Sequence, residues 1–194
     1  MSTSDDLIFD LGGGVLLRLT EEGDHTALAD AQRRNRTHLA PWSPRRPESF
    51  YTAEGQAARI RAGAEEAAAG RLVPWLLVEG DRVVGAVTLS NVVRGPFQSA
   101  DLGYWVAADR TGRGLAGRAV AHVCADAGDR LGLHRVAAAT LLHNAASQRV
   151  LARNGFEPIG VAPHYLHIDG AWRDHRLFQR ILHDALPADQ ALSP

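Results

Sequence analysis

The sequence predicts a single mixed α/β domain with a mostly antiparallel central sheet, one parallel strand pair and flanking helices. Apolar runs of strand length are separated by short turns at 79–82 and at Asp169-Gly170, which is typical of antiparallel hairpins. Between strands expected at 101–106 and 134–141, apolar residues recur at helical spacing, and such a crossover joins parallel strands. The 194 residues are 45% hydrophobic and 22% charged, which suits one domain over 1–194 with a core at about 15–183.

The N-terminal half is expected to begin with a strand, continue with two helices and end in a hairpin. In chain order, we expect a strand at 15–19, a helix from an N-cap at Asp24 to about Leu39, a helix at about 52–69, and strands at 72–78 and 83–89. Three prolines between Pro41 and Pro47 predict a loop between the helices, because proline cannot continue a helix. Gly70 is a suitable stop for the second helix.

The C-terminal half is expected to alternate strands and helices before a final hairpin. The predicted elements are a strand at 101–106, a helix at about 112–131, a strand at 134–141, a short helix at 144–153, and strands at 156–168 and 172–183. The Asp169-Gly170 link favours a type I′ turn, and the tail after Leu186 is expected to fray.

Composition narrows the functional class and the compartment. The net charge of −1 gives no overall nucleic-acid footprint, and no stretch approaches the ~18 apolar residues of a membrane span. The N-terminal residues are polar and acidic, unlike a secretory signal. Cys124 is the single cysteine, so no disulfide can form within the chain. We therefore expect a cytoplasmic protein with no membrane or direct nucleic-acid partner.

A glycine-rich turn at 112–117 follows a strand and opens a helix. Glycine lets the backbone approach a ligand closely, and the free N–H groups of a helix's first turn favour an anion. Arg113 could add a charge-assisted contact. These properties fit a phosphate site, although a turn that only starts the helix is an equally good interpretation of the turn alone.

Three phosphate ligands compete for this turn. A nucleotide triphosphate loop would need Gly-Lys-Ser/Thr, which is absent. The glycine spacing matches a dinucleotide motif, but the next strand ends at Leu142-His143-Asn144 without the carboxylate that would bind a ribose. The third ligand is the pyrophosphate of coenzyme A, which uses the same type of helix N-terminus.

Six motifs follow one another along the second half of the chain. They are DLGYWV at 101–106, the turn at 112–117, LGLHRV at 131–136, NAASQRVL at 144–151, NGF at 154–156 and GAWRDH at 170–175. Together they resemble the GNAT superfamily of N-acetyltransferases, and within it the ribosomal-protein N-terminal alanine acetyltransferases of the RimJ/RimL type. The motif LAPW at 39–42 is also similar to that branch, and the similarity covers about residues 15–182.

The resemblance implies a GNAT-like fold whose parallel strands splay apart, with acetyl-CoA as co-substrate and no metal. It places the pantetheine arm against the backbone of Trp105 and Val106, with Asn144 bonding the arm and Ser147, one helical turn later, also binding the cofactor. It implies that the amides of one segment hold the pyrophosphate, namely Gly112, Arg113, Gly114, Leu115, Ala116 and Gly117. A homodimer is an expectation at family level only.

The resemblance also carries two departures. The superfamily turn usually begins with Gln or Arg, and Thr111 stands there instead. Many members have a tyrosine proton donor where this chain has Leu151, which cannot donate a proton. In the resembled branch the serine of the Asn-x-x-Ser motif can take that role, so Ser147 is expected to protonate the leaving thiolate.

The expected reaction is direct attack of a neutral amine on the thioester of acetyl-CoA, or of another acyl-CoA. A general base helps, because a free α-amine has a pKa near ~8. His164 is the expected base, since it precedes Tyr165-Leu166 where the branch can carry a carboxylate; a solvent-facing strand histidine is the competing interpretation. Trp42, Tyr104 and Tyr165 are expected to line the pocket for the acceptor.

The expected acceptor is a protein or peptide N-terminus or a small-molecule amine. Two other functions stay open at this point. One is a catalytically silent acyl-CoA-binding module, because the tyrosine is missing and the base is unsettled. The other is a dinucleotide-binding oxidoreductase, because the glycine spacing matches that motif.

Overall fold

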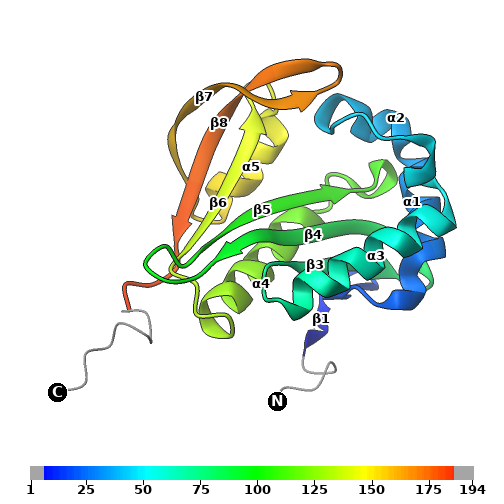
Figure 1. The fold of residues 1–194 in the computed structure, drawn as a ribbon, viewed down its shortest axis with the longest axis horizontal. Coiled ribbons are helices and arrows are strands. Elements are labelled where there is room, and N and C mark those ends of the chain that lie inside the picture. The colour runs from blue at the N-terminus through cyan, green and yellow to red at the C-terminus, as the bar shows by residue number, and fades with distance from the viewer. Residues whose placement is uncertain (1–6, 186–194) are drawn as a thin grey trace.

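The computed structural model describes residues 7–185, which form one eight-stranded sheet flanked by helices (Figure 1). The strand order is β1-β2-β3-β4-β5-β6-β8-β7, and every neighbouring pair is antiparallel except β5 and β6. The strands are β1 (Phe9–Asp10), β2 (Val15–Leu19), β3 (Val73–Glu79), β4 (Arg82–Val93), β5 (Ser99–Val106), β6 (Arg135–Leu141), β7 (Glu157–Ile168) and β8 (Ala171–Ile181). The expected mixed sheet with one parallel pair is confirmed.

Helices cover both faces of the sheet. The α-helices are α1 (His25–Arg34), α2 (Arg36–Leu39), α3 (Ala53–Ala68), α4 (Leu115–Asp129) and α5 (Ala145–Arg153). Short 3-10 helices are η2 (Glu22–Asp24), η3 (Ala40–Trp42), η4 (Glu48–Tyr51) and η5 (Ala108–Arg110). Within the described residues, no helix is long and apolar enough to cross a membrane.

Strand β3 divides the core into two clusters because its side chains alternate between the faces of the sheet. Trp75 and Leu77 belong to the large cluster that α4 completes with Val120 and Val123. Leu76 and Val78 belong to a smaller cluster with Ala31 of α1. Cys124 lies in the large cluster, and its burial raises the pKa of the thiol to about 11, so the thiol stays protonated and packs as an apolar group.

Three expected elements differ from the structure. The helix expected from Asp24 to Leu39 is broken at Asn35 into α1 and α2, and the proline-rich loop begins with the 3-10 helix η3. The helix expected from 112 begins only at Leu115, because Gly112 and Gly114 adopt φ angles of 75° and 74°. Strand β1 was not anticipated, since two residues are too short to show a periodicity.

The two final strands contain the expected tight turn. Ile168 pairs with Ala171, and Asp169 and Gly170 both have positive φ, of 45° and 79°. Two successive positive φ angles are the signature of a type I′ turn. The tail after Leu186, expected to fray, lies outside the described residues.

The parallel strands β5 and β6 separate along their length. They pair only at Ser99–Arg135, Ala100–Val136 and Asp101–Ala137, although β5 continues to Val106 and β6 to Leu141. Strand β6 instead pairs with β8 over its full length. The expected splay is confirmed, and Figure 1 shows β6, β7 and β8 leaving the direction of β5.

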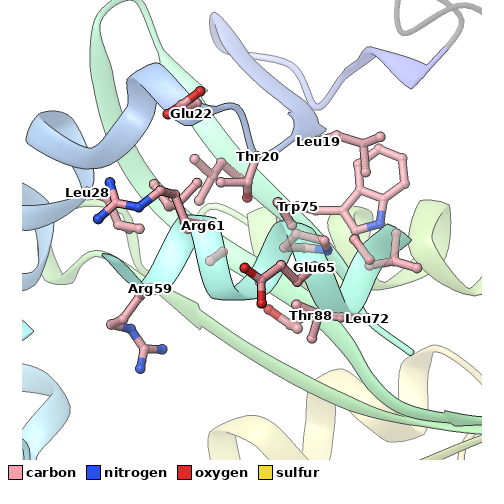
Figure 2. A pocket seen from close by; sticks show the side chains of 18 of the residues that line it. Leu19, Thr20, Glu22, Leu28, Arg59, Arg61, Glu65, Leu72, Trp75 and Thr88 are labelled. Carbon is pink, nitrogen blue, oxygen red and sulfur yellow. The ribbon is translucent and has the colours of Figure 1, made fainter. Parts of the chain in front are cut away.

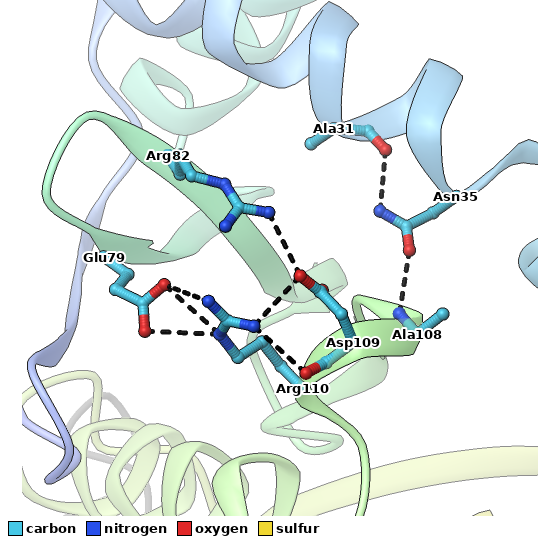
Figure 3. A network of polar contacts seen from close by, with 7 residues as sticks. All are labelled: Ala31, Asn35, Glu79, Arg82, Ala108, Asp109 and Arg110. Atoms are coloured by element: carbon cyan, nitrogen blue, oxygen red, sulfur yellow. Dashed lines mark hydrogen bonds and ion pairs between the residues drawn. The ribbon is translucent and has the colours of Figure 1, made fainter.

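An ionic network fixes the segment that leads from β5 into the glycine turn (Figure 3). Arg110 of η5 donates to both carboxylate oxygens of Glu79, the shortest contact being 2.6 Å, and its Nη1 lies 2.9 Å from Asp109 Oδ2. Arg82 donates to the same carboxylate of Asp109 at 3.2 Å. The network ties the turn between β3 and β4 to η5.

Replacing Glu79 by glutamine is expected to lower the Tm at neutral pH. The Arg110 guanidinium holds the pKa of the Glu79 carboxyl below its ordinary value, so the folded state favours the ionised form. The resulting stabilisation is present above the ordinary pKa of about 4.3 and is lost as the pH falls through the folded value. The Tm difference between wild type and Glu79→Gln, measured from neutral pH to pH ~3, should therefore shrink below pH ~4.3. Glu157→Gln, an exposed β7 carboxylate, is the control, and a constant difference would contradict the ion pair.

Asn35 explains the break between α1 and α2, and it was not singled out by its sequence. Its amide nitrogen donates to the Ala31 carbonyl at 2.9 Å, and its amide oxygen accepts from the Ala108 N–H at 2.8 Å (Figure 3). The side chain is 4% exposed, so both groups need these partners. Asn35 thereby holds α1 against the end of β5.

Asn35→Ala is expected to lower the free energy of unfolding by about 1–3 kcal/mol, because the Ala108 N–H would lose its acceptor. Urea denaturation measures the change. Thr37→Ala, at an exposed position of α2, is the matched control and should stay near wild type. Equal stability of Asn35→Ala and wild type would show that water satisfies these groups.

Candidate active site

The glycine-rich turn presents unpaired backbone donors at the start of α4. Within the described residues, the N–H groups of Leu115, Ala116 and Gly117 make no hydrogen bond outside regular structure, as expected for a first helical turn. Gly114 is the N-cap in the left-handed conformation, and a Cβ there would lie 2.9 Å from Arg118 Nη1. The left-handed backbone therefore favours glycine at position 114. The unpaired N–H groups of the turn are suited to binding an anion.

Arg118 supports the turn from within α4 and was missed by sequence reasoning. Its Nη2 donates to the Arg113 carbonyl at 3.0 Å, and its Nε donates to the Leu11 carbonyl at 2.6 Å. Arg113 and Arg118 also line a depression of about 610 Å³ beside the turn, together with Arg110. Arg113 and Arg118 lie next to free amides and give this end of the site positive charge, while Arg110 is paired with Glu79 and Asp109.

Helix α5 carries the motif Asn144-x-x-Ser147 into the gap between β5 and β6. The Asn144 side-chain oxygen accepts from the Ser147 N–H at 3.1 Å, so Asn144 is the N-cap of α5. In the described part of the chain the Asn144 amide nitrogen has no acceptor, and it remains available to donate to a ligand. Leu151 is fully buried on the same helix, so its side chain packs in the core and offers no hydroxyl to the site.

Tyr104 of β5 joins its strand to helix α5 by binding Ser147. The two hydroxyl oxygens are 2.7 Å apart, and the Tyr104 hydroxyl also lies 3.2 Å from the Ser147 carbonyl. Burial raises the pKa of Tyr104 to about 12, so the phenol stays protonated at neutral pH and acts as a hydrogen-bond donor. Tyr104 was expected only as a pocket residue, and its contact with Ser147 could not be read from positions 43 residues apart.

A cavity of about 620 Å³ is lined by Tyr104 and Trp105 of β5 and by residues of the loop that follows α2. Phe50 of η4, Arg59 of α3 and Asp169 of the β7–β8 turn also line the cavity. Tyr104 therefore belongs both to the hydroxyl pair with Ser147 and to the lining of the cavity. We propose this cavity as the acceptor site, because among the three principal cavities formed by residues 7–185 it is the one that Tyr104 lines.

A second cavity of about 820 Å³ lies between α3 and the sheet (Figure 2). It shares Phe50, Arg59 and Trp105 with the acceptor cavity. Its other lining residues include Leu28, Leu72 and Trp75, which give it an apolar character. Although larger, it is not lined by Tyr104 or Ser147.

Three residues expected at the site lie away from the cavity lining. Trp42 is 39% exposed and packs against His143 at 5.4 Å between ring centroids. Tyr165 is 42% exposed and lies against His175. His164 is exposed on a bulge of β7 at φ 48°, where its N–H donates to Asp174 at 2.9 Å. Their proposed roles therefore remain predictions.

The chain matches the family model for the acetyltransferase (GNAT) domain over residues 15–157. It belongs to the GNAT acetyltransferase family. The GNAT enzyme is 37% identical over 165 residues to a [ribosomal protein uS5]-alanine N-acetyltransferase of Escherichia coli, which covers 84% of this chain and 85% of the relative.

Solved structures give the same family assignment to this GNAT enzyme. A ribosomal-protein-S5-alanine acetyltransferase from Vibrio fischeri superposes with a TM-score of 0.90 at 34% identity, covering 94% of this chain and 100% of the other. Mycobacterium smegmatis RimJ, in complex with CoA-disulfide, superposes with a TM-score of 0.82 at 32% identity, covering 92% and 84%.

The GNAT enzyme is an N-acetyltransferase that takes its acetyl group from acetyl-CoA and transfers it to a primary amine. This assignment removes the dinucleotide oxidoreductase, which shared only the glycine spacing, and it weighs against a silent binding module. Within residues 7–185, no group of three or more His, Cys, Asp or Glu side chains is arranged to hold a metal ion.

Proposed function

We propose that the enzyme acetylates the N-terminal α-amine of a protein or peptide, with a ribosomal protein that begins with alanine as the first candidate. The observation that carries the proposal is the Tyr104–Ser147 hydroxyl pair, 2.7 Å apart, of which Tyr104 also lines the cavity of about 620 Å³. The names of the E. coli and V. fischeri relatives support this acceptor. A small-molecule amine is the second candidate.

In this proposal the cofactor lies along the splayed strands. The amides of 112–117 bind its pyrophosphate, with Arg113 adding charge, and Trp105 and Val106 offer backbone groups to the pantetheine arm. Asn144 donates to the arm through its free amide nitrogen, since its oxygen caps α5. The thioester then reaches Ser147, one helical turn further along.

Ser147 is proposed to protonate the leaving thiolate. The amine nitrogen forms a bond to the thioester carbon, the C–S bond breaks, and the sulfur takes the Ser147 hydroxyl proton. Tyr104 stays protonated, donates toward Ser147 and so leaves the serine hydrogen free to point at the sulfur. The Ser147 alkoxide that remains takes a proton from solvent, and the Tyr104 hydroxyl stabilises it by donating a hydrogen bond.

His164 remains the proposed base and would accept the ammonium proton through water, since it does not line the cavity. Trp42 and Tyr165 remain proposed acceptor contacts at the rim. The pH profile of kcat/KM for His164→Gln tests the base. Loss of the acidic limb supports His164, and an unchanged profile assigns base catalysis to another group or to solvent.

The proposed acceptor is tested by mixing the enzyme and acetyl-CoA with peptides that begin with alanine, with the same peptides blocked at the N-terminus, and with small amines. Thiol release and product mass identify the acceptor. Release only with free N-termini supports the proposal, and release only with small amines supports the second candidate. Cofactor binding without thiol release for any acceptor would instead support a silent module.

The proposal places the enzyme in the cytoplasm, where newly made protein N-termini and acetyl-CoA are both present. It needs no membrane or nucleic-acid partner, and it is compatible with a homodimer. Light scattering of the purified protein measures the oligomeric state directly.

A further inference from the structure

Two arginines share one aromatic ring in the acceptor cavity. The guanidinium carbon of Arg46 lies 5.0 Å from the centroid of Phe50, and that of Arg59 lies 4.8 Å from it. The three residues come from the proline-rich loop, η4 and α3, and all three line the cavity that also contains Tyr104. Both contacts are cation–π interactions, which hold both charges next to the Phe50 ring.

These two charges are not compensated by carboxylates. The other arginines of the cavity are paired, Arg36 with Glu48 and Arg45 with Asp169. Within residues 7–185, Arg46 and Arg59 make no ion pair and no hydrogen bond through their guanidinium groups. The guanidinium of Arg59 points away from the carboxylates of Glu22 and Glu65 in Figure 2.

Both side chains are partly open to solvent, and the environment of Arg59 disfavours its charge unless an anion joins it. Burial, and secondarily the positive charge of Arg46, lower the pKa of the Arg59 guanidinium. An anion between the two groups would favour the charged form of Arg59 and so raise its pKa again. A carboxylate can accept paired hydrogen bonds from a planar guanidinium. The cavity therefore contains a preformed site for a negatively charged part of its ligand.

We propose that Arg46 and Arg59 bind a carboxylate side chain of the acceptor peptide, so that the enzyme prefers N-termini followed closely by Asp or Glu. The inference rests on the proposed function and names its acceptor class. The acceptor amine must approach Ser147 from the part of the cavity that Tyr104 lines, while the carboxylate lies at the part lined by Phe50. An extended peptide advances about 3.3–3.6 Å per residue, so only the first few residues fit between them.

The test compares peptides that begin with alanine and carry one glutamate, moved in turn through the four following positions, with peptides that carry glutamine there. At the best position, kcat/KM is expected to be about tenfold higher for glutamate, because a charge-assisted pair is gained. The ratio should approach unity in Arg46→Gln/Arg59→Gln and fall partly in each single variant. Arg34→Gln removes an exposed charge of α1 outside the cavity and should keep the full ratio.

Raising the salt concentration from about 0.05 M to 0.5 M should reduce the ratio in wild type, which gives a test independent of variant folding. Arg59→Glu should shift the preference toward lysine at the same position. A glutamate preference that survives in the double variant would overturn the site. So would a wild-type ratio of one at every position, or inhibition by an RNA oligonucleotide where inorganic phosphate has no effect, which would point to a nucleic-acid ligand.

Failure of the proposed function gives a different result. If no peptide releases thiol, calorimetry on the CoA-bound enzyme still compares binding of the glutamate and glutamine peptides. Tighter binding of the glutamate peptide, lost in the double variant, supports the anion site without acetylation. Equal binding of the two peptides overturns it.

Discussion

Ser147→Ala is expected to lower kcat by about 100-fold or more, while the affinity for acetyl-CoA changes far less. The magnitude is that of a lost general acid. The Ser147 side chain makes its contact with Tyr104 and not with the backbone donors of the glycine turn, so cofactor binding depends on other groups. Steady-state kinetics with a competent acceptor, together with calorimetric titration of CoA, separates the two effects.

Two further variants decide how this result is interpreted. Tyr104→Phe keeps the ring but removes the hydroxyl, and it should lower kcat less than Ser147→Ala if Tyr104 only orients the serine and stabilises its alkoxide. Ser49→Ala, at an exposed position of η4, should behave as wild type. Unchanged turnover of Ser147→Ala would remove Ser147 from the mechanism and leave proton transfer to solvent.

Gly114→Ala is expected to raise the Kd for CoA by tenfold or more. Alanine at a φ of 74° is strained, and its Cβ would displace the Arg118 guanidinium that donates to the Arg113 carbonyl, so both effects favour a shift of the turn and its amides. One lost hydrogen bond to a charged phosphate costs about 1.5–3 kcal/mol, which is at least a tenfold change in affinity. Titration calorimetry with CoA measures it.

Gly132→Ala is the matched control at the other end of α4. Gly132 also has a positive φ, of 63°, but a Cβ there meets nothing within 4 Å. Both variants should lose about 1 kcal/mol of stability from backbone strain, and only Gly114→Ala should lose CoA affinity. Equal affinity in the two variants would mean that the cofactor does not rest on the turn.

The helix boundaries show where sequence patterns stop being informative. The apolar stripe of α4 was visible as a period, but its start at Leu115 depends on two glycines with positive φ, which a periodicity does not report. The break at Asn35 depends on an acceptor for the Ala108 N–H, 73 residues away. Local helix propensity reveals neither boundary. For Asn35 the reason is that its hydrogen-bond partner, Ala108, lies in another part of the chain.

The candidate site divides in the same way. The glycine turn and the Asn144-x-x-Ser147 motif are local, so the sequence alone determined their positions. The pairing of Tyr104 with Ser147 and the two arginines on Phe50 each need elements that meet only after folding. The roles of Trp42, Tyr165 and His164 were predicted from the motifs next to them in the sequence. None of the three residues lies in the cavity lining.

The sequence by itself determined the fold class, the reaction class and the cofactor, because hydrophobic period, turn chemistry and local motifs are written within short stretches of chain. Only the tertiary structure decided which side chains face one another. It decided the phenol–serine pair between β5 and α5, the hydrogen bond of Asn35 to η5 and the uncompensated charges of the acceptor cavity. These contacts join residues far apart in sequence, and only packing of the helices on the sheet brings them within hydrogen-bond or van der Waals reach.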